Sequence, residues 1–495
     1  MAAPLTSKHR SGLSAHVLKV MGMFSGVQIV AILCSIVRTK LVALWLGPAG
    51  VGLIGIFLTS FDTVAGVAQS GTIGVTRELA MAPKSALARL VAVVRRWGWG
   101  LGLAGMLICV ALSPLLSSFS FENYSHTFDF MLVGVAILFA CIYNMEGAVM
   151  QGTGALVQLG RSTIAGGLLG LALSIPLYYF WGLASIAPAI LVAALSNWIV
   201  RRYMQTTYPL TGQAPGVKET IVSGKSFAVL GMFIAVTSFA SNIVSYIFMT
   251  YLNREAGVET AGYFQAGFTV VNRYVGIVLA AVGTEFLPRP SKVSMSPRRA
   301  ALFITHETIL VLLVMFPLIT LFICCDELIV RLLYDSRFLV MLPFITWAIV
   351  GTVFRAWSWC LAVMILARGD GRAYLLTEIF SALAYLGLNV LFYEHFGIAG
   401  MGYAYALWFL LYLAIVWAVC YGRYHIVLRS SGVLVPLGIL AVSVAAALLK
   451  SMAGWWAAVP FVLLSFVVCV LGMERLLGMN MADLMKKFVG KTKKS

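Results

Sequence analysis

The chain has 495 residues, of which 61% are hydrophobic and only 11% are charged. A soluble protein of this size needs far more polar surface, so the composition excludes a soluble enzyme and predicts an integral membrane protein. The net charge of +17 would fit a nucleic-acid-binding protein only if the cations were gathered on one surface.

Long apolar runs follow one another from the first to the last part of the chain. A spanning helix needs about 20 mostly apolar residues, and about fourteen runs qualify. They lie near residues 17–46, 50–72, 98–118, 128–150, 163–182, 184–200, 226–250, 258–285, 300–325, 338–367, 373–393, 398–420, 432–449 and 454–472. The sequence therefore predicts an all-α membrane protein with about fourteen transmembrane helices and both termini on the same side.

Most of the 35 Lys and Arg residues lie in alternate connections between these runs. The richest segments are 77–96, 201–225, 289–299 and 475–494. Such a bias places basic segments and both termini in the cytoplasm and is a matter of membrane orientation. No nucleic-acid partner is expected, whereas the basic tail is suited to anionic membrane lipids.

An apolar motif occurs twice in the chain. Six residues of the first half recur with the same spacing in the second half, namely Ala49, Gly50, Val51, Gly55, Phe57 and Phe61 as Ala256, Gly257, Val258, Gly262, Phe264 and Phe268. Each copy opens a hydrophobic segment, which indicates a duplication. Membrane proteins built from two related halves usually keep their substrate site where the halves meet, so transport is the first hypothesis.

The longest polar connection divides the chain into the two halves. It contains Pro209, Gly212, Pro215 and Gly216, which disfavour helix. The expected organisation is two pseudo-symmetric six-helix lobes around a central cavity, followed by two further helices. The expected boundaries are 1–205 for the N-lobe, 206–225 for a cytoplasmic linker, 226–425 for the C-lobe, 426–475 for the last two helices and 476–495 for a basic cytoplasmic tail.

Several charged residues fall inside the apolar runs. Because a charge at the bilayer centre costs about 2.5–3.5 kcal/mol, such residues face protein or a water-filled cavity. The basic ones, predicted to bind substrate, are Arg38, Lys40, Arg273 and Arg355, and the acidic ones are Asp62 and Glu378. The excess of cations predicts an anionic cargo, and the planar fork of Arg suits phosphate or diphosphate.

Two other roles are open for these charges. Arg38 or Lys40 could form an ion pair with Asp62, and Arg355 with Glu378, whereas Arg273 has no acidic neighbour in the sequence. Alternatively, Asp62 and Glu378 could bind the proton or sodium ion that couples transport to a gradient.

The sequence gives no reason to expect a cofactor or a metal. The six histidines are scattered without metal-ligand spacing. Gly224, Lys225 and Ser226 resemble the end of a P-loop, but Glu219 stands where that motif requires glycine. We therefore expect a transporter that is not driven directly by ATP, and no catalytic residues.

Two segments carry a resemblance to a known family. Residues 40–52, KLVALWLGPAGVG, resemble the end of the first helix of Wzx-type flippases. The segment with Gly262, Tyr263, Phe264 and Gln265, continuing through Tyr274, Gly276 and Phe286 to Arg289, resembles their eighth helix. Topology and length extend the likeness over roughly residues 15–420, and Lys40 matches the family's basic residue seven positions before Gly-Pro.

This resemblance implies a member of the multidrug/oligosaccharidyl-lipid/polysaccharide exporter superfamily in the bacterial inner membrane. Its implied cargo is an undecaprenyl-diphosphate-linked oligosaccharide, moved to the periplasmic leaflet by alternating access for O-antigen or exopolysaccharide synthesis. Polysaccharide polymerase and chain-length proteins are its implied neighbours. The thirteenth and fourteenth helices are a departure shared with lipid II flippases, which leaves a lipid II-type cargo as an alternative.

Two rivals remain at the level of the sequence. A drug/cation antiporter of the same superfamily should have an acid-rich cavity, which the excess of cations disfavours. A membrane polymerase or glycosyltransferase should carry exposed catalytic acids, and the clustered external acids are limited to Asp326, Glu327 and Asp335.

Overall fold

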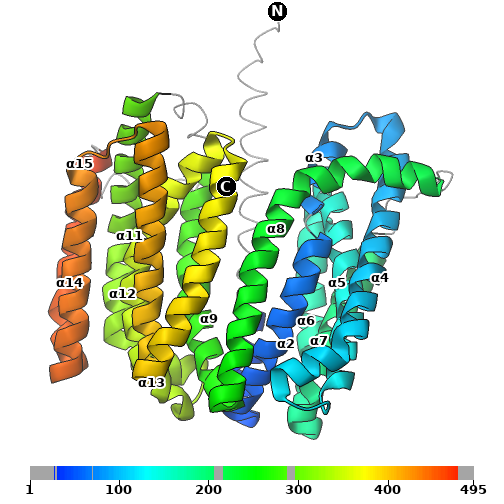
Figure 1. Cartoon of the computed structure of the whole chain (residues 1–495), viewed down its shortest axis with the longest axis horizontal. Coiled ribbons are helices and arrows are strands. Elements are labelled where there is room, and N and C mark those ends of the chain that lie inside the picture. The colour runs from blue at the N-terminus through cyan, green and yellow to red at the C-terminus, as the bar shows by residue number, and fades with distance from the viewer. Residues whose placement is uncertain (1–26, 28–29, 70, 206–215, 287–295, 478–495) are drawn as a thin grey trace, which may run out of the picture. The chain divides into compact units, whose positions relative to one another are not determined.

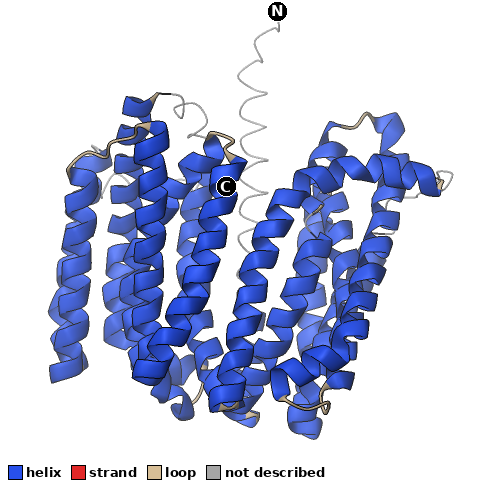
Figure 2. Ribbon diagram, viewed as in Figure 1, coloured by secondary structure: helices blue, strands red, loops and turns tan. Residues whose placement is uncertain are grey.

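The computed structural model describes residues 27, 30–69, 71–205, 216–286 and 296–477. Within these ranges the chain consists of helices joined by short turns, without a strand (Figure 2). Ten helical stretches among them are long and apolar enough to cross a bilayer. The protein is therefore an all-α, multi-pass membrane protein, as expected, because helices satisfy their own backbone hydrogen bonds in lipid.

The chain divides into two compact units, Met1–Gly262 and Tyr263–Ser495. The first unit contains a helix over residues 30–45. It continues with α2 (Gly47–Gln69), α3 (Thr72–Met81), α4 (Lys84–Phe121), α5 (Thr127–Gly152), α6 (Leu156–Trp181), the short 3-10 helix η1 (Gly182–Ser185), α7 (Ile186–Met204) and α8 (Val217–Ala256). These helices run from blue to green in Figure 1.

The second unit begins within α9 (Val258–Phe286). Its other elements are α11 (Pro297–Leu333), η2 (Ser336–Met341), α12 (Leu342–Ala367), α13 (Gly371–Tyr424), α14 (Ser431–Ala453), η3 (Trp455–Ala458) and α15 (Val459–Leu477). α14 and α15 pack against α11, and α14 also against α12 (Figure 1). The last two helices are thus part of the second unit.

Two long helical stretches each hold two of the expected spans. α6 and α7 are separated only by η1, so residues 156–204 form one stretch of 49 residues. α13 has 54 residues but is broken at Gly397, whose φ of 61° and ψ of −143° are not helical. A positive φ favours glycine, so this residue marks the boundary between the expected runs 373–393 and 398–420. The total of about fourteen spans stays a prediction, since part of the first run lies outside the described residues.

The expected lobe boundaries are not decided by this division into units. Residues 206–215 of the expected linker and most of the expected tail lie outside the described residues. Residues 217–225 of that linker form the first turns of α8. The five boundaries therefore stay predictions.

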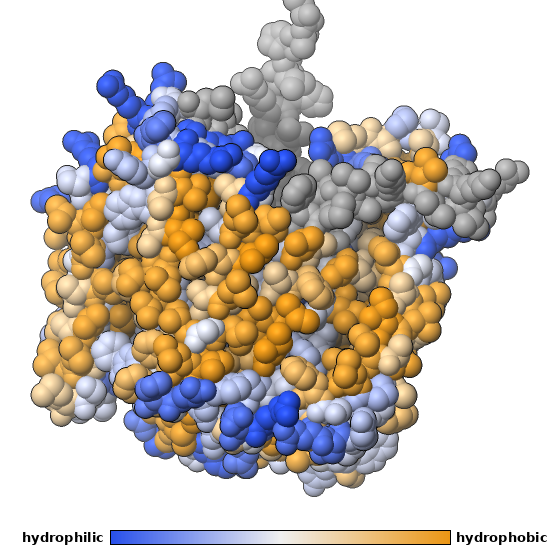
Figure 3. All heavy atoms as spheres, viewed as in Figure 1, coloured by the Kyte–Doolittle hydropathy of each residue, from blue (hydrophilic) through white to orange (hydrophobic). Residues whose placement is uncertain are grey.

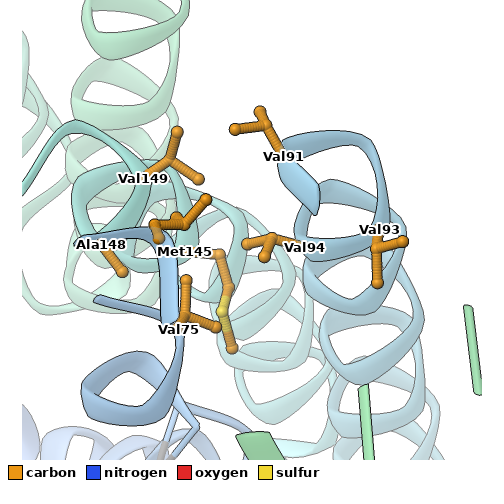
Figure 4. Packing of buried hydrophobic residues seen from close by; sticks show 8 residues of the cluster. Val75, Val91, Val93, Val94, Met145, Ala148 and Val149 are labelled. Carbon is orange, nitrogen blue, oxygen red and sulfur yellow. The ribbon is translucent and has the colours of Figure 1, made fainter. Parts of the chain in front are cut away.

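The helices of each unit are apolar along their length and polar towards their ends, as Figure 3 shows for one face. Inside the first unit, α3, α4 and α5 share a cluster of buried aliphatic side chains, including Val75, Val94 and Met145 (Figure 4). This cluster fixes the end of α5 that carries Tyr143 and Glu146. In the second unit, α12 and α13 pack closely along one another.

We expect Gly402→Ala to destabilise the second unit. A Cβ at Gly402 on α13 would lie 2.6 Å from the backbone oxygen of Phe344 and 2.9 Å from Cβ of Trp347, both on α12. Such overpacking costs about 1–3 kcal/mol. The melting temperature of the purified protein should fall, whereas Gly387→Ala, also on α13 but with nothing within 4 Å, should leave it unchanged or higher. Equal melting temperatures for the two variants would show that the helices are not in close contact here.

Candidate functional site

Arg355 lies on α12 and is half-buried within the second unit. Its Nη1 donates hydrogen bonds to Oδ1 of Asn272, at 2.6 Å, and to the hydroxyl of Tyr405, at 3.1 Å. The ring of Phe409 lies 5.6 Å from the guanidinium carbon. No carboxylate of the described residues lies within 4 Å of it, so these partners accept hydrogen bonds from Nη1 without neutralising the charge.

Close contact between two helices brings these partners to Arg355. Gly351 lies one turn before Arg355, and a Cβ there would be 2.7 Å from Cα of Ala406. The backbones of α12 and α13 can therefore approach closely, which sets Tyr405 beside Arg355. From α9, Asn272 donates through Nδ2 to the carbonyl of Phe268, at 3.1 Å, and this bond leaves Oδ1 as the acceptor for Arg355.

Glu378 lies on α13 and has a different partner. Its Oε1 accepts a hydrogen bond of 2.7 Å from the hydroxyl of Tyr412. The ion pair between Arg355 and Glu378, which the sequence left open, is not formed among the described residues. Glu378 is half-buried, and its role as a proton or sodium site stays a prediction.

Aromatic rings connect these two charged groups. Along α13, the ring centroids of Tyr385 and Trp408 are 4.9 Å apart, and those of Trp408 and Phe409 are 4.2 Å apart. Trp408 also donates from Nε1 to the hydroxyl of Ser381, at 2.9 Å. We call this group the second-unit cluster: Phe268, Asn272, Arg355, Glu378, Ser381, Tyr385, Tyr405, Trp408, Phe409 and Tyr412. It combines the carboxylate of Glu378 with ring faces, hydroxyl groups and the cation of Arg355, which contacts no carboxylate of the described residues. The part around Arg355 is suited to an anionic ligand with polar substituents.

The structure describes fewer contacts for the other predicted basic residues. Arg273 lies on α9, next to Asn272, but its side chain is outside the described residues. Arg38 and Lys40 are half-buried on the helix over residues 30–45 in the first unit. Nε of Arg38 is buried without a hydrogen-bond partner in the described part of the chain.

Asp62 on α2 is exposed, and Nδ2 of Asn242 on α8 donates to its backbone oxygen at 2.9 Å. The described residues contain no ion pair between Arg38 and Asp62, one of the pairings that the sequence left open. The substrate and ion-coupling roles of these residues stay predictions.

The sequence did not reveal the partners of these charges. Asn272, Tyr405 and Tyr412 lie in apolar runs and carry no motif, and aromatic residues at helical spacing usually form a core. Only the contacts among α9, α12 and α13 bring them to Arg355 and Glu378.

The three acids that we expected to be external are all engaged in ion pairs. Asp326 is paired with Lys450, Glu327 with Arg331 at 2.7 Å and Asp335 with Arg337 at 2.7 Å. Hydrogen bonds from Arg337 and from the backbone of Ser336 hold the pKa of Asp335 below its usual value. A general acid needs a raised pKa, so this group is poorly suited to acid catalysis.

Comparisons with known proteins show which proteins this chain is similar to. A family model described as polysaccharide biosynthesis protein matches residues 41–343. The lipid III flippase of Escherichia coli (strain K12) is 23% identical to this chain over 356 residues, covering 69% of this chain and 82% of the flippase.

Solved structures of two kinds have a similar fold. The lipid II flippase MurJ, in its inward closed conformation, matches with a TM-score of 0.69 and 13% identity over 92% of this chain and 99% of MurJ. An inward-facing multidrug resistance MATE family transporter of the MOP superfamily matches with a TM-score of 0.66 and 13% identity over 80% of this chain and 94% of the transporter. At these identities the likeness concerns the fold alone.

Proposed function

Because the chain belongs to the polysaccharide biosynthesis protein family, we propose that it is a flippase for undecaprenyl-diphosphate-linked oligosaccharide repeat units. It moves them from the cytoplasmic to the periplasmic leaflet of the bacterial inner membrane, for the synthesis of a surface polysaccharide such as O-antigen or exopolysaccharide. The similarity to a lipid III flippase supports transport of a lipid-linked saccharide, and it supports a transporter in preference to an enzyme.

The observation that carries this proposal is the uncompensated charge of Arg355 in the second-unit cluster. Among the described residues its guanidinium is bonded to neutral groups only, so an arriving diphosphate meets a cation for which none of their carboxylates competes. The cluster's rings and hydroxyl groups are suited to the adjoining sugar. Arg38, Lys40 and Arg273 are proposed to attract the same head group, while the polyprenyl tail stays in lipid. Asp62 and Glu378 are proposed ion-coupling sites.

A drug/cation antiporter shares this fold, but a cationic drug would be repelled by Arg355. Lipid II, the cargo that the name of the similar flippase MurJ states, remains the alternative cargo. Both termini are proposed to be cytoplasmic, and the polymerase and chain-length proteins of the same polysaccharide are proposed partners.

Depletion of the protein from cells tests the proposal and identifies the cargo. Lipid extracts should accumulate a complete diphosphate-linked repeat unit, detected by mass spectrometry. That unit should be shielded from a membrane-impermeant glycan-modifying reagent. An intermediate that accumulates unpolymerised but accessible from outside would instead indicate a polymerase. If no lipid-linked saccharide accumulates, the proposal is wrong.

A further inference from the structure

A second basic site lies in the first unit, at the end of α7. Arg201 belongs to the basic segment 201–225, which we expected to lie in a cytoplasmic connection. The structure instead places it in the last turn of α7, with its side chain only 3% exposed. A buried cation is costly unless it is paired, so its surroundings call for a physical explanation.

Neutral groups surround the Arg201 guanidinium. Nε donates to the hydroxyl of Ser162 at 3.2 Å, and Nη1 to the carbonyl of Tyr143 at 3.1 Å. Nη2 donates to the hydroxyls of Tyr143, at 2.9 Å, and Thr163, at 2.8 Å, and the Tyr143 ring lies 3.6 Å from the guanidinium carbon. Arginine has five N–H groups, so one N–H of Nη1 has no partner among the described residues.

Glu146, the nearest acid, already has other partners. Glu146 forms an ion pair of 2.7 Å with Nε of Arg95 and accepts a hydrogen bond from Gln205. No carboxylate of the described residues lies within 4 Å of Arg201. Its hydrogen bonds are therefore largely satisfied, but its charge is not neutralised by direct contact.

Arg201 lines a cavity of about 390 Å³ inside the first unit. This volume lies within the usual range of small-ligand sites. Its polar lining consists of Gln69, Thr72, Thr76, Tyr143, Asn144, Gln151, Thr163 and Arg201, and no Asp, Glu or Lys of the described residues lines it. Asn144 donates to Gln69 at 2.7 Å, which orders these two amides in the wall.

We propose that this cavity binds a phosphoryl anion, with Arg201 as the charged ligand and the neutral side chains of the wall as further donors. An anion of this kind would neutralise the buried charge and accept a hydrogen bond from the N–H of Nη1 that has no partner among the described residues. The cavity lies near α3, the end of α5 and the end of α7, next to basic segments that the positive-inside bias assigns to the cytoplasm. The identity of the ligand rests on the proposed function: it is the diphosphate of the lipid-linked saccharide before transport. A phospholipid headgroup would supply the same chemistry.

The test measures binding with the full-length protein, without transport. Native mass spectrometry in neutral detergent would measure how tightly the protein binds farnesyl diphosphate, which serves as the probe. Every protein in the test carries Arg355→Gln as a background substitution, so that binding at the second-unit cluster does not hide binding in the cavity. Arg201→Gln should weaken binding of the probe at least tenfold. The matched control Arg202→Gln removes the neighbouring exposed charge and should change binding less than twofold.

A second variant keeps the test valid if Arg201→Gln misfolds. Thr76→Glu puts a carboxylate into the cavity wall, where it should compete with the anion and also weaken binding at least tenfold. Displacement of the probe by inorganic pyrophosphate alone would identify a diphosphate as the ligand. Displacement by phosphatidylglycerol would identify a phospholipid headgroup, and both results support the anion site.

The proposal is overturned if the background protein binds no probe, or if Arg201→Gln and Thr76→Glu bind it as well as the Arg202→Gln control. The binding test does not depend on flipping, which is measured separately in vesicles. A chain that binds at Arg201 but does not flip its cargo would therefore contradict the proposed function alone. A chain that flips, with binding unchanged in both cavity variants, would contradict the anion site alone.

Discussion

Arg355→Gln is expected to reduce export of the lipid-linked saccharide roughly a hundredfold, with the protein still present in the membrane. Glutamine keeps a hydrogen-bonding side chain near Asn272 and Tyr405 but removes the charge. Loss of one partner from a buried, charged hydrogen bond costs about 2–5 kcal/mol, and about 3 kcal/mol corresponds to this factor. The measurement is the rate at which surface polysaccharide appears in a deletion strain, at matched protein levels.

The control for Arg355→Gln removes a charge from the same unit without touching the second-unit cluster. Arg331 is 55% exposed and forms a surface ion pair with Glu327. Arg331→Gln should leave export unchanged, because such surface pairs contribute little. Arg355→Lys should restore part of the export, since lysine keeps the charge but loses the planar fork. Wild-type export by Arg355→Gln would remove Arg355 from the substrate site.

Lys450→Met is expected to destabilise the second unit by about 3–5 kcal/mol, because it leaves a buried carboxylate without its counter-ion. Asp326 on α11 is only 1% exposed, and Lys450 on α14 forms an ion pair with its Oδ2. Thr346 on α12 donates to the same oxygen at 2.8 Å, while Oδ1 is buried without a hydrogen-bond partner among the residues that the structure describes. This pair therefore joins α14 to α11 and α12, and its loss should lower both the melting temperature and the cellular amount of protein.

Removing both charges should restore most of that stability. In Lys450→Met combined with Asp326→Asn, no buried charge is left unpaired, so the double variant should melt above the single Lys450→Met variant. Arg331→Met, which breaks an exposed pair with Glu327, is the matched control and should change the melting temperature little. The interpretation fails if Lys450→Met melts like the wild type.

The helical segments could largely be predicted from hydropathy. α2, α5, α12 and α14 nearly coincide with expected apolar runs, since every backbone polar group in lipid must be satisfied within its own helix. α4 and α11 contain their expected runs, 98–118 and 300–325, but are longer, and α4 begins at Lys84. The breaks at η1 and Gly397 also lie at boundaries between expected runs, 163–182 and 184–200 in the first case and 373–393 and 398–420 in the second. The early start of α8 at Val217 was missed, since the helix continues through residues that resemble a polar linker.

The candidate site could be predicted only in part. Hydropathy draws attention to a charge within an apolar run, and so it led to Arg355 and Glu378. It says nothing of partners far away in the sequence, and Asn272, Tyr405 and Tyr412 become visible only when α9, α12 and α13 pack together. Arg201 was missed for a different reason. The last turn of a helix and a cytoplasmic loop have the same basic composition, and burial alone separates them.

Flipping by the purified protein tests the central claim most directly. The protein would be reconstituted into vesicles that contain an undecaprenyl-diphosphate-linked oligosaccharide, and a membrane-impermeant reagent would modify the glycans on the outer leaflet. With the wild-type protein, nearly all of the cargo should become modified over time, whereas protein-free vesicles should keep their inner-leaflet share. If wild-type vesicles protect the same share as protein-free vesicles, this chain is not the flippase.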